Sequence, residues 1–355
     1  MASTYDDRVP SNGTPLYCAQ PPQPERVLRP DLSPERARAI LVGQSKWVNG
    51  TVIRYCFFDE LGGGQSRDQL DEVRSAFQDW KNIGIGLEFR EVADPSESEV
   101  RIGFRQGDGS WSYVGVNVLE HSTRERTMNF GWDLTSPHGR ATARHEIGHA
   151  IGFAHEHQNP FAGIVWDEEK VYADLGGPPN NWPRTTTFHN VLRKLSPNEV
   201  EGSDWDPDSI MEYGFSAGLI VQPEEFRGGI DSPRNLSAKD KHFVQKWYPP
   251  IAAKPARLQP FQSMALSLDP GKQADFEIIP PETRKYELGT FGNSDAVMVL
   301  FEDVDGELRY LAGEDDSGVD MNGRVTVKLF KGRRYVLRTR LYSTWGSGNV
   351  ALMYW

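Results

Sequence analysis

His145-Glu-Ile-Gly-His-Ala-Ile-Gly-Phe-Ala-His155 is the stretch that says most about the fold and chemistry of this chain. His145 and His149 are four residues apart, so on a helix they project from one face and can share a metal ion. Glu146 can reach a water on that metal. Gly152 tolerates the left-handed turn that ends a helix, which lets the chain swing back and present His155. Three nitrogen ligands and one open position are typical of catalytic zinc.

An alternation of helices and strands surrounds this motif. Val52–Phe58 is apolar and aromatic, as in a buried strand, and Ser66 with Gln69 fits a capping box. An amphipathic helix of about four turns follows the capping box. Three strand-like runs then precede the motif helix at Arg140–Ile151: Gly86–Val92, Glu99–Phe104 and Ser110–Val118. This order predicts an α/β or α+β domain with a mixed sheet.

The length of 355 residues predicts more than one domain. Residues 1–44 are interrupted by prolines and form an irregular leader, in which Ser33 is placed to cap a short helix at Arg36–Leu41. Residues 45–250 contain the motif domain. A helix capped by Ser237 and Asp240 is expected at the end of that domain, before a linker near residues 249–256.

The last part of the chain, residues 257–355, has a different texture and predicts an all-β sandwich. Short alternating runs recur there between turn residues. Eight such runs are predicted strands: Met264–Leu268, Ala274–Ile279, Tyr286–Thr290, Ala296–Phe301, Leu308–Ala312, Arg324–Leu329, Tyr335–Leu341 and Val350–Tyr354. This half has no histidine and no cysteine, so the chemistry is expected in the first domain.

Composition excludes several functional classes. The formal net charge is -11, whereas phosphate binding needs clustered Lys and Arg, so we expect no nucleic-acid partner. No run approaches 18 consecutive apolar residues, so we expect no membrane partner. We expect a monomer. No secretory signal peptide is visible in the chain as given.

The motif resembles the extended zinc signature of metzincin metallopeptidases, which is followed by a methionine turn. Ser209-Ile-Met-Glu-Tyr213 is the candidate for that turn, and Phe153 with Glu156 makes the match most similar to the astacin-like branch. Four more stretches look like bacterial and fungal members of that branch: Ser110–Gly115, Thr127–Trp132, His155–Pro160 and Leu236–Asp240. The resemblance covers about residues 45–250. Typical astacins carry more cysteines than the two of this chain.

The resemblance implies a zincin catalytic domain and a zinc-dependent endopeptidase that acts on proteins or peptides. The three motif histidines would hold one catalytic zinc ion, with Glu146 as general base. Met211 would form an apolar floor below the site, and Tyr213 would lie near the metal and stabilise the oxyanion. Trp111, Tyr113 and Gly115 would belong to an edge strand that binds an extended substrate.

Two alternative functions remain open. One is a peptidase of narrow specificity that acts on a single target. The other is a leader-inhibited zymogen whose C-terminal module serves binding. His157 is not at one of the three ligand positions of the motif. It is expected to contact the ligand residues from outside the metal site, or to lie on the surface.

The two cysteines leave three possibilities. Cys18 in the leader could occupy the open metal position, as in a cysteine switch, although the glycine and acidic residue of the known switch sequence are missing. Cys18 could instead form a disulfide with Cys56, or remain an ordinary thiol.

The C-terminal part resembles the pre-peptidase-like β-sandwich modules that follow the catalytic domain in many secreted bacterial peptidases. That resemblance favours an extracellular location. Its acidic clusters are candidate calcium ligands, but solvated acidic loops are the favoured interpretation, because no regular calcium loop is present. The clusters are Asp303 with Asp305, and Glu314, Asp315 and Asp316.

Overall fold

The structure, a computed structural model, describes most of the chain: residues 16–22, 45–58, 66–197, 200, 204–251, 255–304, 306–314, 322–342 and 347–355. The helix predicted at Arg36–Leu41 lies outside these residues. Among the described residues, no helix is both long and apolar enough to cross a membrane. The chain forms two compact units: the first comprises Met1–Trp47, Ile53–Asn82 and Phe89–His242, and the second Val48–Val52, Ile83–Glu88 and Phe243–Trp355.

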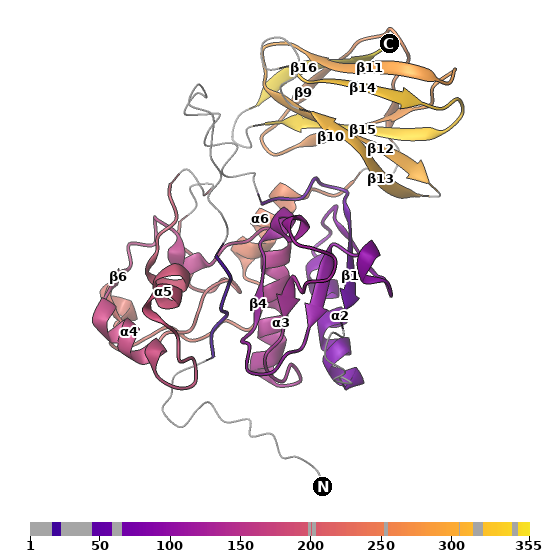
Figure 1. The fold of residues 1–355 in the computed structure, drawn as a ribbon. Coiled ribbons are helices and arrows are strands. Elements are labelled where there is room, and N and C mark those ends of the chain that lie inside the picture. Colours follow the sequence, from indigo (N-terminus) through magenta and orange to yellow (C-terminus); the bar gives the residue numbers. More distant parts are fainter. Residues whose placement is uncertain are drawn as a thin grey trace. The chain divides into compact units, whose positions relative to one another are not determined.

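A mixed five-stranded sheet precedes the motif, as predicted (Figure 1). Its order is β2-β1-β3-β5-β4, with the strands β1 (Val52–Phe57), β2 (Glu88–Glu91), β3 (Val100–Gly103), β4 (Trp111–Ser112) and β5 (Met128–Asn129). Strand β3 is parallel to both β1 and β5, whereas β4 runs antiparallel to β5 and ends the sheet. The strand predicted at Ser110–Val118 is therefore shorter than expected. Gly115 has a φ of 50°, and Gly115–Glu120 forms a 3₁₀ helix (η2).

Helices α2 (Arg67–Lys81) and α3 (Pro137–Ala150) pack together in the first unit. The indole nitrogen of Trp80 donates a hydrogen bond of 3.0 Å to the carbonyl of Arg144, which joins the two helices. The predicted capping box is not formed, because the Ser66 side chain makes no capping hydrogen bond. The Gln69 amide instead accepts a hydrogen bond of 2.9 Å from the backbone N–H of Leu134.

The region after the motif, poor in periodicity, holds short elements. They are η3 (Glu156–Gln158), β6 (Val165–Trp166), α4 (Glu168–Gly176), α5 (Arg184–Thr187), the π-helical turn η4 (Phe188–Leu192), β7 (Ile220–Gln222), η5 (Glu224–Phe226) and α6 (Ala238–Trp247). The predicted cap of α6 is present: the backbone N–H of Asp240 donates to Ser237 Oγ at 2.9 Å, and the N–H of Ser237 donates to Asp240 Oδ2 at 2.8 Å.

The second unit contains the predicted β-sandwich (Figure 1). One sheet has the order β13-β12-β15-β10-β8 and the other β14-β11-β16-β9. Its strands are β8 (Ala256–Arg257), β9 (Met264–Leu268), β10 (Gln273–Ile278), β11 (Arg284–Phe291), β12 (Ala296–Val304), β13 (Glu307–Glu314), β14 (Arg324–Leu329), β15 (Arg334–Leu341) and β16 (Gly348–Tyr354). All eight predicted strands are present. Buried Leu288 and Leu352 of one sheet share a core with Leu300 and Leu337 of the other.

Candidate active site

The motif lies at the carboxyl end of α3, and local signals define where this helix begins and ends. The Ser136 side chain accepts a hydrogen bond of 3.0 Å from the N–H of Gly139, which caps the amino end. Gly152 has a φ of 109°, so the left-handed turn expected there is present. The N–H of Phe153 donates to the carbonyl of Gly148 at 3.0 Å, and the chain then turns back towards the helix. This turn brings His155 to the two helical histidines.

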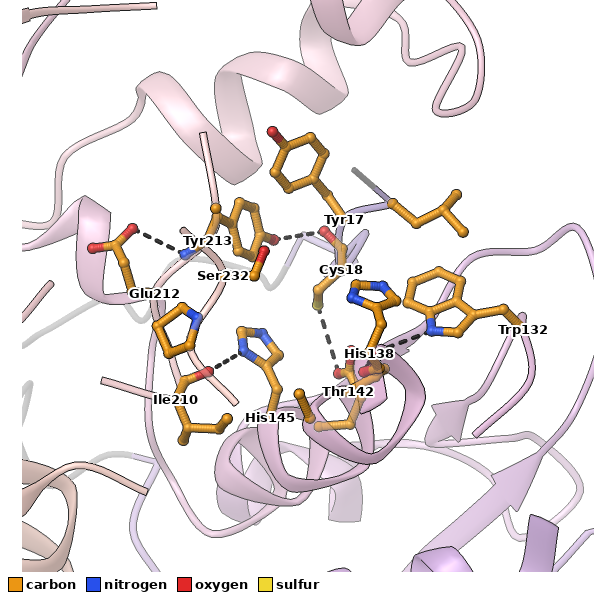
Figure 2. A pocket seen from close by; sticks show the side chains of 15 residues that line it. Tyr17, Cys18, Trp132, His138, Thr142, His145, Ile210, Glu212, Tyr213 and Ser232 are labelled. Carbon is orange, nitrogen blue, oxygen red and sulfur yellow. Dashed lines mark hydrogen bonds between the residues drawn. The ribbon is translucent and has the colours of Figure 1, made fainter. Parts of the chain in front are cut away.

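The three motif histidines and Cys18 form one buried cluster. One ligand atom from each of Cys18, His145, His149 and His155 lies within 4.8 Å of the others. His149 is 0% exposed and His155 is 1% exposed. Figure 2 shows Cys18 and His145 among the side chains that line a small pocket.

Backbone carbonyls orient two of the imidazoles. His145 Nδ1 lies 2.7 Å from the carbonyl oxygen of Ile210, and His149 Nδ1 lies 2.8 Å from that of Phe153. A carbonyl can only accept, so each Nδ1 carries the proton and each Nε2 presents a lone pair to the cluster. Burial lowers the pKa of His145 to about 4 and that of His149 well below the usual range. Both rings are therefore neutral, as metal ligands must be.

This donor set fits a zinc ion. The Nε2 atom of His145 is buried and has no hydrogen-bond partner among the described residues. His149 Nε2 lies 3.1 Å from His155 Nε2 and 3.6 Å from Cys18 Sγ. Ligands on a tetrahedral zinc ion with bonds of about 2.0–2.3 Å are about 3.3–3.8 Å apart. The observed separations are close to these values, so the group could hold such an ion.

Glu146 lies beside the cluster in a fully buried position. Its Oε2 atom is 3.6 Å from Cys18 Sγ, and Oε1 has no hydrogen-bond partner in the described part of the chain. Burial raises the pKa of Glu146 to about 8, an effect that the Cys18 hydrogen bond partly offsets. A carboxyl group with such a pKa can both accept and return a proton near neutral pH.

The methionine turn packs under the motif helix. Met211 is fully buried. A Cβ atom on Gly148 would overlap the sulfur of Met211, so only glycine lets the turn approach this closely. The carbonyl of the preceding residue, Ile210, orients His145 (Figure 2). Met211 thus packs against α3 at Gly148, the residue before His149.

Tyr213 extends from the turn to the cluster. Its hydroxyl lies 2.8 Å from His155 Nε2 and donates a hydrogen bond of 2.6 Å to the carbonyl oxygen of Cys18 (Figure 2). Burial raises the pKa of the phenol well above its usual value, so the hydroxyl keeps its proton. Tyr213 therefore donates to a peptide carbonyl at this position.

The leader lies on the edge of the sheet. Cys18 forms a parallel bridge with Ser110, the N–H of Ala19 donates to the carbonyl of Ser110 at 2.9 Å, and the Gln20 side chain reaches the carbonyl of Ser112. Of the predicted substrate-strand residues, Trp111 lies on edge strand β4, and Tyr113 follows it. Gly115 is not in this strand, because it begins η2.

Both cysteines are free, so the disulfide between them is absent from the structure. Cys56 is on strand β1, and its Sγ atom lies 3.2 Å from Ser98 Oγ. Burial raises the pKa of the Cys18 thiol, and the Glu146 carboxylate raises it further. Cys18 thus lies in the group of side chains that could hold a metal ion, together with the three motif histidines.

Three buried residues of this site escaped the sequence-based prediction or were left undecided by it. Glu212 accepts from the N–H of Tyr213 at 2.9 Å and from the indole of Trp205 at 2.7 Å. His157 lies behind the cluster, with Nδ1 3.4 Å from Glu212 Oε1 and Nε2 2.8 Å from the carbonyl of Asn190. No periodic or spacing signal marks Glu212. Tyr17, the third such residue, lies in a leader with no periodic pattern.

The candidate calcium ligands cannot be placed together. Asp305, Asp315 and Asp316 lie outside the described residues, and the side chain of Glu314 is not described either. Among the described residues, the Cys18 and histidine cluster is the one group arranged to hold a metal ion.

Comparisons with known proteins agree with this geometry. Residues 41–171 match the family model of the astacins, a family of peptidases. The chain is 26% identical over 215 residues to the zinc metalloproteinase nas-36 of Haemonchus contortus, a match that covers 58% of this chain and 31% of that protein. It is 30% identical over 121 residues to the hatching enzyme of Paracentrotus lividus, covering 31% of this chain and 20% of that enzyme. The chain thus spans less than a third of these curated relatives.

One solved structure is matched over almost its full length. The structure of myroilysin aligns with a TM-score of 0.52 and 35% identity, over 59% of this chain and 98% of that chain. The family model, the long match to myroilysin and the convergent histidines of the motif lead to the same assignment. The chain belongs to the astacin family of zinc metallopeptidases.

Proposed function

We propose that this chain is a zinc-dependent endopeptidase in which Glu146 acts as the general base. The observation that carries the proposal is the convergence of three neutral imidazoles beside one buried carboxylate. Zinc held by His145, His149 and His155 would supply Lewis acidity, which polarises a peptide carbonyl and makes a water more acidic. This pairing of a base with an electrophilic centre is what amide hydrolysis requires.

Glu146 and Tyr213, which lie beside the cluster, have separate roles in the proposed reaction. Glu146 removes a proton from the attacking water and returns it to the departing amine, a role that its raised pKa supports. Tyr213 donates a hydrogen bond to the carbonyl oxygen of the cleaved bond as negative charge develops on it. The hydrogen bond from Tyr213 to the carbonyl of Cys18 supports this role, because that carbonyl belongs to a peptide lying across the site.

An extended polypeptide substrate would pair with the edge strand β4 at Trp111 and Tyr113. The exposed edge of a sheet offers free backbone groups to such a peptide. The leader already forms a backbone contact of this type with Ser110, and its Gln20 side chain adds a contact with the carbonyl of Ser112. We therefore infer that protein or peptide chains, and not nucleic acids, are the substrates.

We also infer that the chain is a latent peptidase, whose leader blocks the proposed active site. Cys18 Sγ lies 3.6 Å from both His149 Nε2 and Glu146 Oε2. A thiolate there would complete the metal ligand set and would shield the general base from water. Residues 1–44 are then an inhibitory leader, residues 45–250 a monomeric peptidase domain and residues 257–355 an accessory sandwich with no assigned partner.

The decisive experiment measures zinc and proteolysis together. The full chain and its Cys18→Ala variant are analysed for zinc content and for digestion of casein. In the Cys18→Ala background, Glu146→Gln should keep one zinc ion per chain but lose nearly all turnover, because the amide cannot accept the proton. The exposed Glu97 provides the matched control, Glu97→Gln. Full proteolysis by the Glu146→Gln variant would refute the assignment.

A further inference from the structure

One leader side chain belongs to the hydrophobic core of the peptidase unit. Tyr17 is only 4% exposed. Its ring centroid lies 5.0 Å from that of Tyr213, 5.9 Å from Phe215 and 6.0 Å from Trp182. Further buried members of the same cluster come from the elements after the motif: Ile164, Val171, Leu175, Val191, Leu219 and Ile220. We call the position of the Tyr17 ring within this cluster the Tyr17 pocket. Figure 2 shows Tyr17 beside Tyr213.

The backbone at this pocket is held as a bound peptide would be. The carbonyl of Cys18 accepts from Tyr213, and the N–H of Tyr17 donates to Asn180 Oδ1 at 3.2 Å. On the other side, Ala19 pairs with Ser110. The residue at the metal cluster is Cys18, so the Tyr17 pocket receives the side chain of the immediate neighbour in the peptide. A substrate whose cleaved bond replaces Cys18 at the cluster would place a flanking side chain in the same pocket.

We propose that the Tyr17 pocket is a substrate subsite that selects an aromatic side chain at one of the two residues flanking the cleaved bond. This inference rests on the proposed peptidase function and adds a substrate class to it. The aromatic and aliphatic walls offer an apolar ring a large buried contact, which a small side chain cannot match.

The polar groups of the pocket refine the selection. The Tyr17 hydroxyl is buried and has no hydrogen-bond partner among the described residues. Phenylalanine should therefore be accepted at least as well as tyrosine, since it leaves no buried hydroxyl unpaired. The Asp174 carboxylate on α4 lies close enough to raise the pKa of the Tyr17 phenol, after burial itself. Its negative charge should exclude an acidic side chain from the pocket.

The first test measures substrate selection with peptides. A series that differs only at the two residues flanking the cleaved bond carries Phe, Tyr, Leu, Ala or Asp. Its kcat/KM is measured with the zinc-loaded chain that carries both Tyr17→Ala and Cys18→Ala, so that no ring of the leader fills the pocket. At one of the two positions, Phe and Tyr should exceed Ala by about tenfold or more, and Asp should be the poorest. Trp182→Ala should reduce this aromatic preference, while the exposed-ring control Phe161→Ala should not. Efficient cleavage with no aromatic preference at either position overturns the subsite and leaves the peptidase function intact.

The second test needs no catalysis, so it separates the two proposals. In a Cys56→Ala background, the rate at which a thiol reagent modifies Cys18 reports how firmly the leader is held. Tyr17→Phe should leave the buried thiol as slow to react as in the parent chain. Tyr17→Ala and Tyr17→Asp should raise the rate by about tenfold or more, because the pocket loses its ring or receives a charge. Equal rates in all four chains would show that the pocket does not select its occupant. Selective rates in a chain that never cleaves peptides would support the aromatic pocket and contradict the peptidase function.

Discussion

The carboxylate of Asp240 accepts a hydrogen bond of 2.9 Å from the backbone N–H of Ile210, whose own carbonyl orients His145. Asp240 also accepts a hydrogen bond of 2.6 Å from Ser209 Oγ and one from the N–H of Ser237. A single buried side chain therefore joins the start of α6 to the methionine turn. Through the Ile210 carbonyl, the methionine turn orients His145, one of the proposed zinc ligands.

Replacement of Asp240 by alanine should destabilise the protein and weaken zinc binding. It removes an acceptor shared by three donors, two of them backbone groups, and leaves those donors unsatisfied. We expect a loss of about 2–4 kcal/mol in the free energy of unfolding, measured by urea denaturation. Zinc affinity, measured by competition with a chelator, should fall by about 10–100-fold.

The exposed Asp208 provides the matched control for this experiment. Asp208→Ala should stay within about 0.5 kcal/mol of the parent chain in unfolding free energy. If Asp240→Ala kept full stability and zinc affinity, the proposed link between α6 and His145 would be wrong.

The contrast between Gly152 and Glu212 shows what can be predicted from this sequence. Gly152 acts locally: its freedom to adopt a positive φ determines how the chain leaves α3, so the spacing of the motif was enough to predict the turn. The alternating strands of the sandwich are local patterns too, and all eight were predicted. The role of Glu212 depends on tertiary contacts, because its carboxylate contacts Trp205 and His157. No spacing pattern in the sequence predicts these contacts.

The failed capping box at Ser66 follows the same logic. The pattern of Ser66 and Gln69 is correct for a local cap, but Gln69 finds partners near Asp133 and Leu134, more than 60 residues away in the chain. Tertiary contacts thus displaced a local preference. The leader illustrates the point more strongly. Proline-rich sequence predicted an irregular segment, yet Tyr17 and Cys18 are buried against the peptidase unit.

Removal of the Cys18 thiol should activate the full chain. Cys18→Ala keeps the leader but deletes the sulfur that lies next to His149 and Glu146. Casein hydrolysis per zinc ion should rise by about tenfold or more, because the position that the thiolate would hold on the metal becomes free for water. Cys56→Ala, which removes the other buried thiol away from the cluster, should leave latency unchanged. Identical activity of the parent and Cys18→Ala chains would mean that the thiol does not block the site.

A methyl group on Gly148 should disturb the site through Met211. The Cβ atom of an alanine would overlap the sulfur of Met211 and lie 3.2 Å from the ring of Trp80, so the buried Met211 side chain or the turn that carries it must shift. We expect a loss of about 1–3 kcal/mol in unfolding free energy, as for other overpacked cores, together with reduced zinc affinity.

Gly228→Ala is the control for that variant, because a Cβ atom at Gly228 meets nothing within 4 Å. Its unfolding free energy should change by less than about 0.5 kcal/mol. Normal stability and zinc binding in Gly148→Ala would contradict the close packing of the turn against α3.

His138 should make the stability of the protein fall below neutral pH. Its ring stacks on Trp132, with centroids 5.7 Å apart, and burial, with a smaller contribution from Arg234, lowers its pKa. The unfolded chain, with a histidine pKa of about 6.5, then binds a proton more readily than the folded one. Above about pH 6.5 the ring is neutral in both states and does not change the free energy of unfolding. As the pH falls from there towards the folded pKa, the free energy of unfolding decreases, by at most about 1.4 kcal/mol per pH unit.

Unfolding free energies of the parent chain and of His138→Gln, each measured at pH 7.5 and 5.5, test this prediction. The variant should lose less stability on acidification than the parent, because the contributions of the zinc ligands are common to both chains and cancel. An equal loss in both chains would show that His138 takes up its proton in the folded state as easily as in the unfolded one.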